Sequence, residues 1–192
     1  LHEQNSLKDI KKIKNAEIVN LRSRKHSKFK NNKLKLEKII YVSNSFTYPR
    51  NSYPNMRPKD KLYKRMQKSF LCSLENTGFP VLIKLHPKGN QVVAEYLNKY
   101  GFVHGSLSDH FGEGNIFAFD VLTSAMVEAL SAGECVILWD TGIRHKSEYF
   151  ETLRPYAYII EGRRPHIEGS DIKDFFQSNS SGRREYSKGF YE

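Results

Sequence analysis

Thr123, Ser124 and Glu128 are the side chains whose types and spacing most clearly suggest chemistry. They follow an apolar run and open an apolar helical segment, so the two hydroxyls and the first N–H groups of the helix would converge on one point, which is a site for an anion. Glu128 stands four residues after Ser124 on the same helix face, where its carboxylate would suit ribose hydroxyls. The simpler interpretations are an ordinary N-cap and a salt bridge. A capping box is not one of them, since its acid stands three residues after the cap.

His86 is the second candidate, at the end of an apolar run and directly before Pro87. A residue before proline is restricted to extended backbone, so Pro87 fixes the direction of the imidazole. The ring can donate to a phosphate whether it is neutral or protonated. The alternative is a histidine bonded to a backbone carbonyl, although Lys88 and Gly89 favour the anion site.

Arg50 lies in a loop at residues 44–58, which is long for an α/β connection and therefore suggests a functional segment. Its guanidinium could bind a phosphate through two hydrogen bonds. The His, Asp and Glu residues between positions 104 and 113 match no standard metal-ligand spacing, so we expect no metal site. Cys72 and Cys135 are isolated, which argues against a disulfide framework and a structural zinc.

Elements that would position these side chains can be predicted from apolar periodicity and from Gly and Pro. We expect strands at residues 38–43, 79–86, 115–122, 135–139 and 156–160, and a short strand within 102–114. Helices are expected at 60–76, which Gly78 ends, 91–100, with Gly101 as its C-cap, 124–132, 147–153 and 171–177. Continuous apolar strands alternating with helices predict an α/β fold with a Rossmann-like, doubly wound parallel sheet. Such sheets bind ligands at the carboxyl ends of their strands.

Charge is unevenly distributed along the 192 residues, whose net charge is +10. Residues 1–38 contain 12 Lys/Arg against 4 Asp/Glu, residues 44–68 contain 7 against 1, and the remainder is mildly acidic. These two basic segments suit an anionic substrate or a membrane surface as well as RNA. We expect a basic N-terminal segment or linker at 1–37, one domain at 38–178 and a disordered tail at 179–192. No apolar run is long enough to span a membrane, and a cytoplasmic protein is expected.

Two motifs carry a resemblance to a known group of enzymes. Lys84, Leu85, His86 and Pro87 form the first, and residues 120–137, which read DVLTSAMVEALSAGECVI, form the second. Together they resemble the C-terminal, donor-binding half of GT-B fold glycosyltransferases of bacterial surface-polysaccharide assembly. The resemblance includes capsule and sialic-acid transferases and CDP-glycerol glycerophosphotransferases.

The resemblance implies a role for each residue. His86, in its His-Pro motif with Pro87, would contact the donor phosphate, and its catalytic role would be to stabilise that leaving group. Arg50, which the loop at 44–58 suggests independently of the resemblance, would help to bind the same donor. Thr123 and Ser124 would bind phosphate and Glu128 the ribose. Residues 43–45, which are Ser43, Asn44 and Ser45, would form the phosphate loop of the first strand.

The substrate would be a CMP-, CDP- or UDP-linked sugar, with no further cofactor. An N-terminal acceptor domain would be a partner, because the acidic motif that marks the catalytic base in sialyltransferases is absent from this sequence. The protein would then lie at the inner membrane face, held by its basic segment. Two alternatives stay open: a basic nucleic-acid-binding module, although nucleic acid is not favoured, and half of a sugar-nucleotide 2-epimerase.

Overall fold

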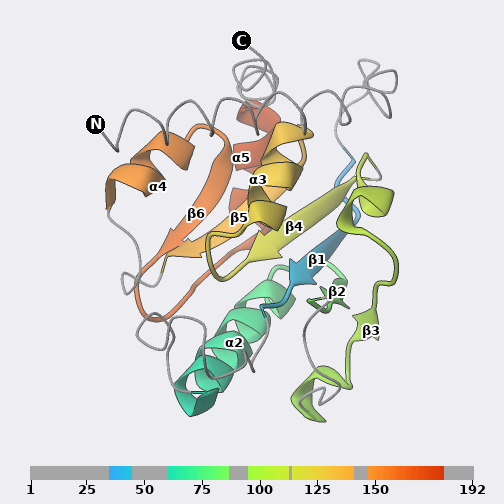
Figure 1. The fold of residues 1–192 in the computed structure, drawn as a ribbon. Coiled ribbons are helices and arrows are strands. Elements are labelled where there is room, and N and C mark those ends of the chain that lie inside the picture. The colour runs from blue at the N-terminus through green and yellow to red at the C-terminus, as the bar shows by residue number, and fades with distance from the viewer. Residues whose placement is uncertain (1–34, 45–59, 87–94, 113, 141–146, 180–192) are drawn as a thin grey trace, which may run out of the picture.

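The computed structural model describes residues 35–44, 60–86, 95–112, 114–140 and 147–179. Within them the chain alternates between strands and helices (Figure 1). The elements are β1 (Lys38–Val42), α2 (Asp60–Glu75), β2 (Val81–Lys84), the 3-10 turn η2 (Glu95–Leu97), β3 (Gly101–Phe102), the 3-10 turn η3 (Leu107–His110), β4 (Asn115–Phe119), α3 (Ser124–Ser131), β5 (Cys135–Asp140), α4 (Ser147–Leu153), β6 (Ala157–Glu161) and α5 (Gly169–Ser178).

All six strands pair in parallel, in the order β3-β2-β1-β4-β5-β6. The order reverses between β1 and β4, as in a doubly wound sheet. The central strands are buried on both faces, and all five residues of β4 are buried. Continuous apolar runs are therefore what these positions require. The predicted Rossmann-like α/β fold is confirmed.

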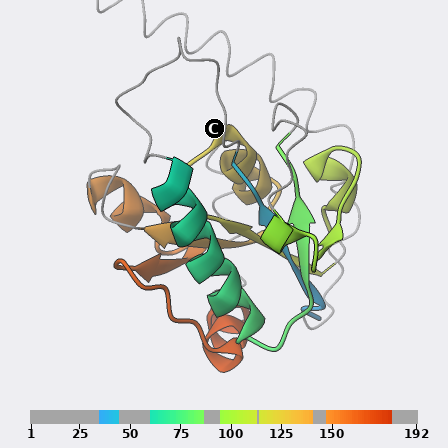
Figure 2. The same ribbon diagram turned by 90° about the horizontal axis from the view of Figure 1, so that it is seen from below.

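Two hydrophobic cores cover the two faces of the sheet. One lies under α2 and α5 and includes Phe70, Trp139 and Phe176, with the Phe70 and Trp139 rings stacked at 5.4 Å between centroids. The other lies under η3, α3 and α4 and includes Phe117 and Met126. Figure 2 shows α2 and α5 on one side of the sheet and α3 on the other. Helix α2, which follows β1 in sequence, covers one face of the sheet, and α3, which follows β4, covers the opposite face. In such sheets the carboxyl ends of these two strands border a crevice.

Helix α2 ends as the sequence predicts, because Gly78 has a φ of 78°, a conformation that glycine adopts at little cost. Its buried face differs in detail from the apolar pattern. Leu62 is 47% exposed, whereas Tyr63 and Gln67 are buried beside Phe70. Two polar side chains thus face the core one helical turn apart, and each needs a hydrogen-bonding partner there.

The helix expected at 91–100 is not observed in the part of it that the structure describes. Residues 95–97 form a 3-10 turn, and residues 91–94 lie outside the described residues. Gly101 is not a C-cap but the first residue of β3, paired with Leu82. A Cβ at position 101 would lie 3.0 Å from Leu82 Cδ2, the end of a flexible side chain, so glycine here avoids a tight contact and does not serve a left-handed turn. The segments 1–34 and 180–192 also lie outside the described residues.

Among the described helices, none combines the length and the apolar character that crossing a membrane requires.

Candidate functional site

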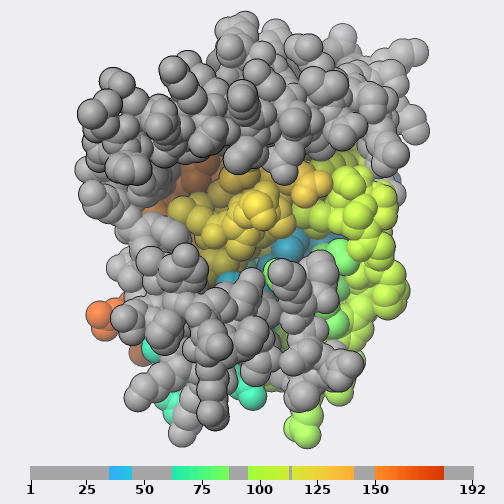
Figure 3. Space-filling view, viewed as in Figure 1, coloured from blue at the N-terminus to red at the C-terminus, as the bar shows by residue number. Residues whose placement is uncertain are grey.

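The carboxyl ends of β1 and β4 define what we call the switch point, made of residues 42–44 and 120–123. The two strands are neighbours in the sheet, and Tyr41 stands opposite Ala118. In doubly wound sheets the crevice at this position is the usual ligand site. Figure 3 shows β1 (blue) at the floor of a hollow between α3 (yellow) and the yellow-green segment that contains β3 and η3.

Thr123 is the N-cap of α3. Its backbone is extended, with φ −138° and ψ 161°, and its Oγ1 accepts a hydrogen bond of 3.2 Å from the Met126 N–H. The capping interpretation of Thr123 therefore describes its observed contact, and an anion would share this hydroxyl with the helix. The N–H groups of Ser124 and Ala125, at the first two helical positions, point out of the helix end, as helix geometry requires. The Ser124 side chain is exposed beside them.

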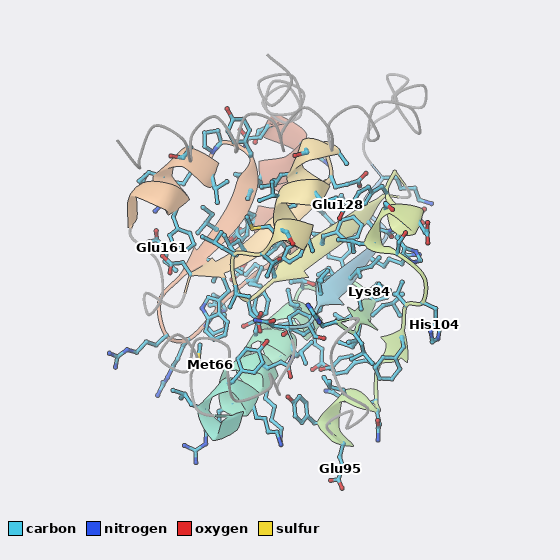
Figure 4. All side chains as sticks on the ribbon, in the orientation of Figure 1. Met66, Lys84, Glu95, His104, Glu128 and Glu161 are labelled. Carbon is cyan, nitrogen blue, oxygen red and sulfur yellow. The ribbon has the colours of Figure 1, made fainter. Side chains whose placement is uncertain are left out.

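Glu128 is half-buried on α3 (Figure 4), and burial raises the pKa of its carboxyl above the ordinary value. Val127, the preceding residue, is 39% exposed. The charged form of Glu128 is thus partly withdrawn from water and gains from any ligand that donates hydrogen bonds to it. Vicinal ribose hydroxyls are donors of this kind.

The end of β2 is tied to the end of β1. Val42 stands opposite Lys84, and the Ser43 N–H donates to the Lys84 carbonyl at 2.9 Å. His86, two residues beyond Lys84, is half-buried and follows at the same edge of the sheet. Ser43 is buried, 5% exposed, and Asn44 is half-buried. The structure thus brings residues 43–44 to the same sheet edge as His86 and as the N-terminus of α3.

Three of the predicted site residues, Ser45, Arg50 and Pro87, lie outside the described residues. Their contribution stays a prediction. Within the described ranges, no group of three or more His, Cys, Asp or Glu side chains is arranged to hold a metal ion.

Asp120 at the switch point forms a group with Tyr41 and Tyr63 that the sequence did not reveal. The Tyr41 and Tyr63 hydroxyls each donate to Asp120 Oδ2 at 2.7 Å. Gln67 Nε2 donates to the Tyr41 hydroxyl at 2.8 Å, and the Tyr96 hydroxyl donates to Gln67 Oε1. We call these five residues the Asp120 network.

Electrostatics in the network keep the tyrosines protonated. Burial, followed by the negative charge of Asp120, raises the pKa of both Tyr41 and Tyr63 well above the ordinary value. The sequence carried one signal of this network: Tyr63 and Gln67 are spaced by one helical turn, and Asp120 directly follows a buried strand.

Comparison of the chain with protein-family models, with curated proteins and with solved structures gives no match.

Proposed function

We propose that this chain is the nucleotide-sugar donor-binding domain of a glycosyltransferase that assembles cell-surface polysaccharide. The observation that supports this function best is the arrangement at the switch point. An exposed hydroxyl at the first position of α3, a half-buried carboxylate one turn further and the strand end that leads to His86 all lie beside the crevice where doubly wound sheets bind nucleotides.

Each part of a nucleotide-sugar has a matching group in this proposal. The N–H groups at the start of α3 and the Ser124 hydroxyl bind the diphosphate, because the helix dipole and its first N–H groups favour negative charge. Glu128 accepts hydrogen bonds from the ribose hydroxyls. His86 donates to the phosphate that leaves, where charge develops in the transition state. The acceptor and its catalytic base belong to a separate domain.

Thermal denaturation with CMP, CDP, UDP, GDP and a short single-stranded RNA tests the proposal. A ligand at about 100 times its dissociation constant adds about 2.7 kcal/mol to the free energy of unfolding. For a chain of this size this corresponds to a rise in Tm of roughly 5–11 °C. We expect one mononucleotide to give such a shift. If only the RNA stabilises the protein, with a steep salt dependence, the chain is a nucleic-acid-binding module.

Glu128→Gln should have opposite effects on the free protein and on ligand binding. The raised pKa of Glu128 means that the folded state disfavours the carboxylate, so stability decreases as pH rises from the unfolded to the folded pKa. A neutral amide should therefore raise Tm slightly at pH 7. It should also raise the Kd of the mononucleotide about 10- to 100-fold, which corresponds to the free energy of a hydrogen bond to a charged group.

Glu95→Gln is the matched control, because Glu95 is exposed at η2, away from α3 (Figure 4). It should leave the ligand-induced shift unchanged. The proposal is wrong if no mononucleotide raises Tm, or if Glu128→Gln and Ser124→Ala both retain the full shift.

A further inference from the structure

The Asp120 network contains one contact that bears directly on the switch point. The Tyr63 hydroxyl, which donates to Asp120 Oδ2 at 2.7 Å, also accepts a hydrogen bond from the backbone N–H of Asn44. Asn44 belongs to the chain that leaves β1, and Asp120 begins the turn that leads to Thr123 and α3. One hydroxyl on α2 therefore joins the two backbone segments at the switch point, although the helices that follow these segments cover opposite faces of the sheet.

We infer that Tyr63 is a positioning residue for the nucleotide site, whose hydroxyl holds the Asn44 backbone and the Asp120 turn at the separation that the ligand requires. The inference rests on the proposed function. Tyr63 would then raise the affinity for the ligand without contacting it.

Burial supports this role. Tyr63 is 6% exposed and Asp120 5% exposed, so neither side chain is open to a ligand in the crevice, and their effect on binding must pass through the backbone that they hold. Further hydrogen bonds hold the Asp120 carboxylate in place, because the Tyr41 hydroxyl donates to the same carboxylate oxygen and itself accepts from Gln67. A carboxylate that accepts several hydrogen bonds in a buried network is held in place by them, and these bonds thereby restrain the backbone at position 120.

The remainder of the network provides a control at a distance from the crevice. The Tyr96 hydroxyl donates to Gln67 Oε1 at the outer end of the network, where Tyr96 is half-buried and Lys68 lies over its ring. Tyr96→Phe and Tyr63→Phe each delete one hydroxyl of the same network. Only Tyr63→Phe releases the Asn44 backbone.

The test compares these two variants in the complete chain by two measurements. The first is amide hydrogen exchange without ligand. Exchange of the Ile40 amide, in the middle of β1, reports any loss of global stability. Tyr63→Phe should raise the exchange rate of the Asn44 amide about tenfold or more beyond the change at Ile40, whereas Tyr96→Phe should add no such local increase at Asn44.

The second measurement is calorimetric titration with the mononucleotide, among CMP, CDP, UDP and GDP, that stabilises the wild type most. Tyr63→Phe should raise Kd about tenfold, since ordering the backbone of one released residue has a cost of this order. Tyr96→Phe should keep Kd within about twofold, even where the two variants lose similar amounts of Tm. A similar loss of affinity in both variants would show that the network acts only on stability, and would overturn the inference.

Failure of the inference differs from failure of the proposed function. If the wild type binds a mononucleotide and Tyr63→Phe binds it equally well, or if the Asn44 amide keeps its exchange rate, the inference is wrong and the proposed function stands. If the wild type binds no mononucleotide, both are wrong. Should Tyr63→Phe not fold, Asp120→Asn replaces it. This variant keeps an acceptor oxygen but weakens the bond to Tyr63, and should raise Kd and Asn44 exchange in the same direction.

Discussion

Asp120→Ala is the substitution whose cost can be derived most directly from the structure. The Asp120 carboxylate is 5% exposed and accepts 2.7 Å hydrogen bonds from two tyrosine hydroxyls, those of Tyr41 and Tyr63. Both tyrosines are buried as well. Alanine would remove the acceptor of both hydroxyls and would place no other acceptor in the same position.

The expected decrease in the free energy of unfolding follows from leaving two buried hydroxyl donors without an acceptor. A buried polar group without its partner costs about 1–3 kcal/mol, so two hydroxyls cost about 2–6 kcal/mol. Removal of a buried carboxylate offsets part of this cost, because burying this charged group lowers the stability of the wild type. We therefore expect a loss of about 2–4 kcal/mol, a large fraction of the roughly 5–15 kcal/mol that stabilise a typical domain. Tm should fall by about 4–16 °C.

Urea denaturation of a double-mutant cycle gives the measurement. Asp120→Ala and Tyr63→Phe are compared singly and together, and a coupling energy of about 1 kcal/mol or more is expected because the two groups share a hydrogen bond. Asp120→Asn, which keeps an acceptor oxygen, should lose less than half as much as the alanine variant. The reasoning is refuted if Asp120→Ala unfolds at the urea concentration of the wild type, or if the two substitutions are additive.

Two further predictions concern the stability of the fold. Gly114→Ala should destabilise the protein more than Gly112→Ala although both positions have positive φ, because a Cβ at 114 would lie 2.2 Å from the Lys35 carbonyl oxygen while nothing lies within 4 Å at 112. If both variants have the same urea midpoint, and each loses only the roughly 1–2 kcal/mol of unfolding free energy expected from backbone strain alone, the steric argument is contradicted. Above pH 10 the free energy of unfolding should decrease as pH rises, by up to about 1.4 kcal/mol per pH unit for each buried tyrosine, because Tyr41 and Tyr63 keep protons in the folded state that the unfolded chain releases. Tyr41→Phe should reduce this slope, and urea midpoints that stay constant from pH 9 to 11 in the wild type would rule out the effect.

Much of the sheet could be predicted because its strands are buried on both faces. A strand in this position has to be apolar throughout, so it stands out from its surroundings without any knowledge of its neighbours. β4 shows the limit of this signal. The apolar pattern extends to residue 122, yet the strand ends at Phe119. The next residue, Asp120, lies outside the strand and its carboxylate accepts hydrogen bonds from the tyrosines. The prediction for residues 147–153 was confirmed as α4.

The contacts that shape the switch point could not be predicted in the same way. Tyr41 and Asp120 are 79 residues apart in the sequence, and Tyr63 and Asp120 are 57 apart. Periodicity shows which face of an element is buried, but it does not show which buried polar groups meet. On α2 the apolar pattern predicts that Leu62 is buried, but Tyr63 is buried instead. A phenol ring has enough apolar surface for the core, while its hydroxyl reaches a hydrogen-bonding partner.

The charge of the Asp120 network limits how the proposed ligand can be held. The two tyrosine hydroxyls are neutral donors, so they orient the carboxylate without cancelling its negative charge. The N-terminus of α3 supplies only about half an elementary positive charge. A diphosphate at this crevice therefore needs cations from elsewhere in the chain. Residues 44–68, which run from just after β1 into α2, are rich in them, with 7 Lys/Arg against 1 Asp/Glu. The basic residues of this segment are thus the cations that an anionic donor at the switch point would require.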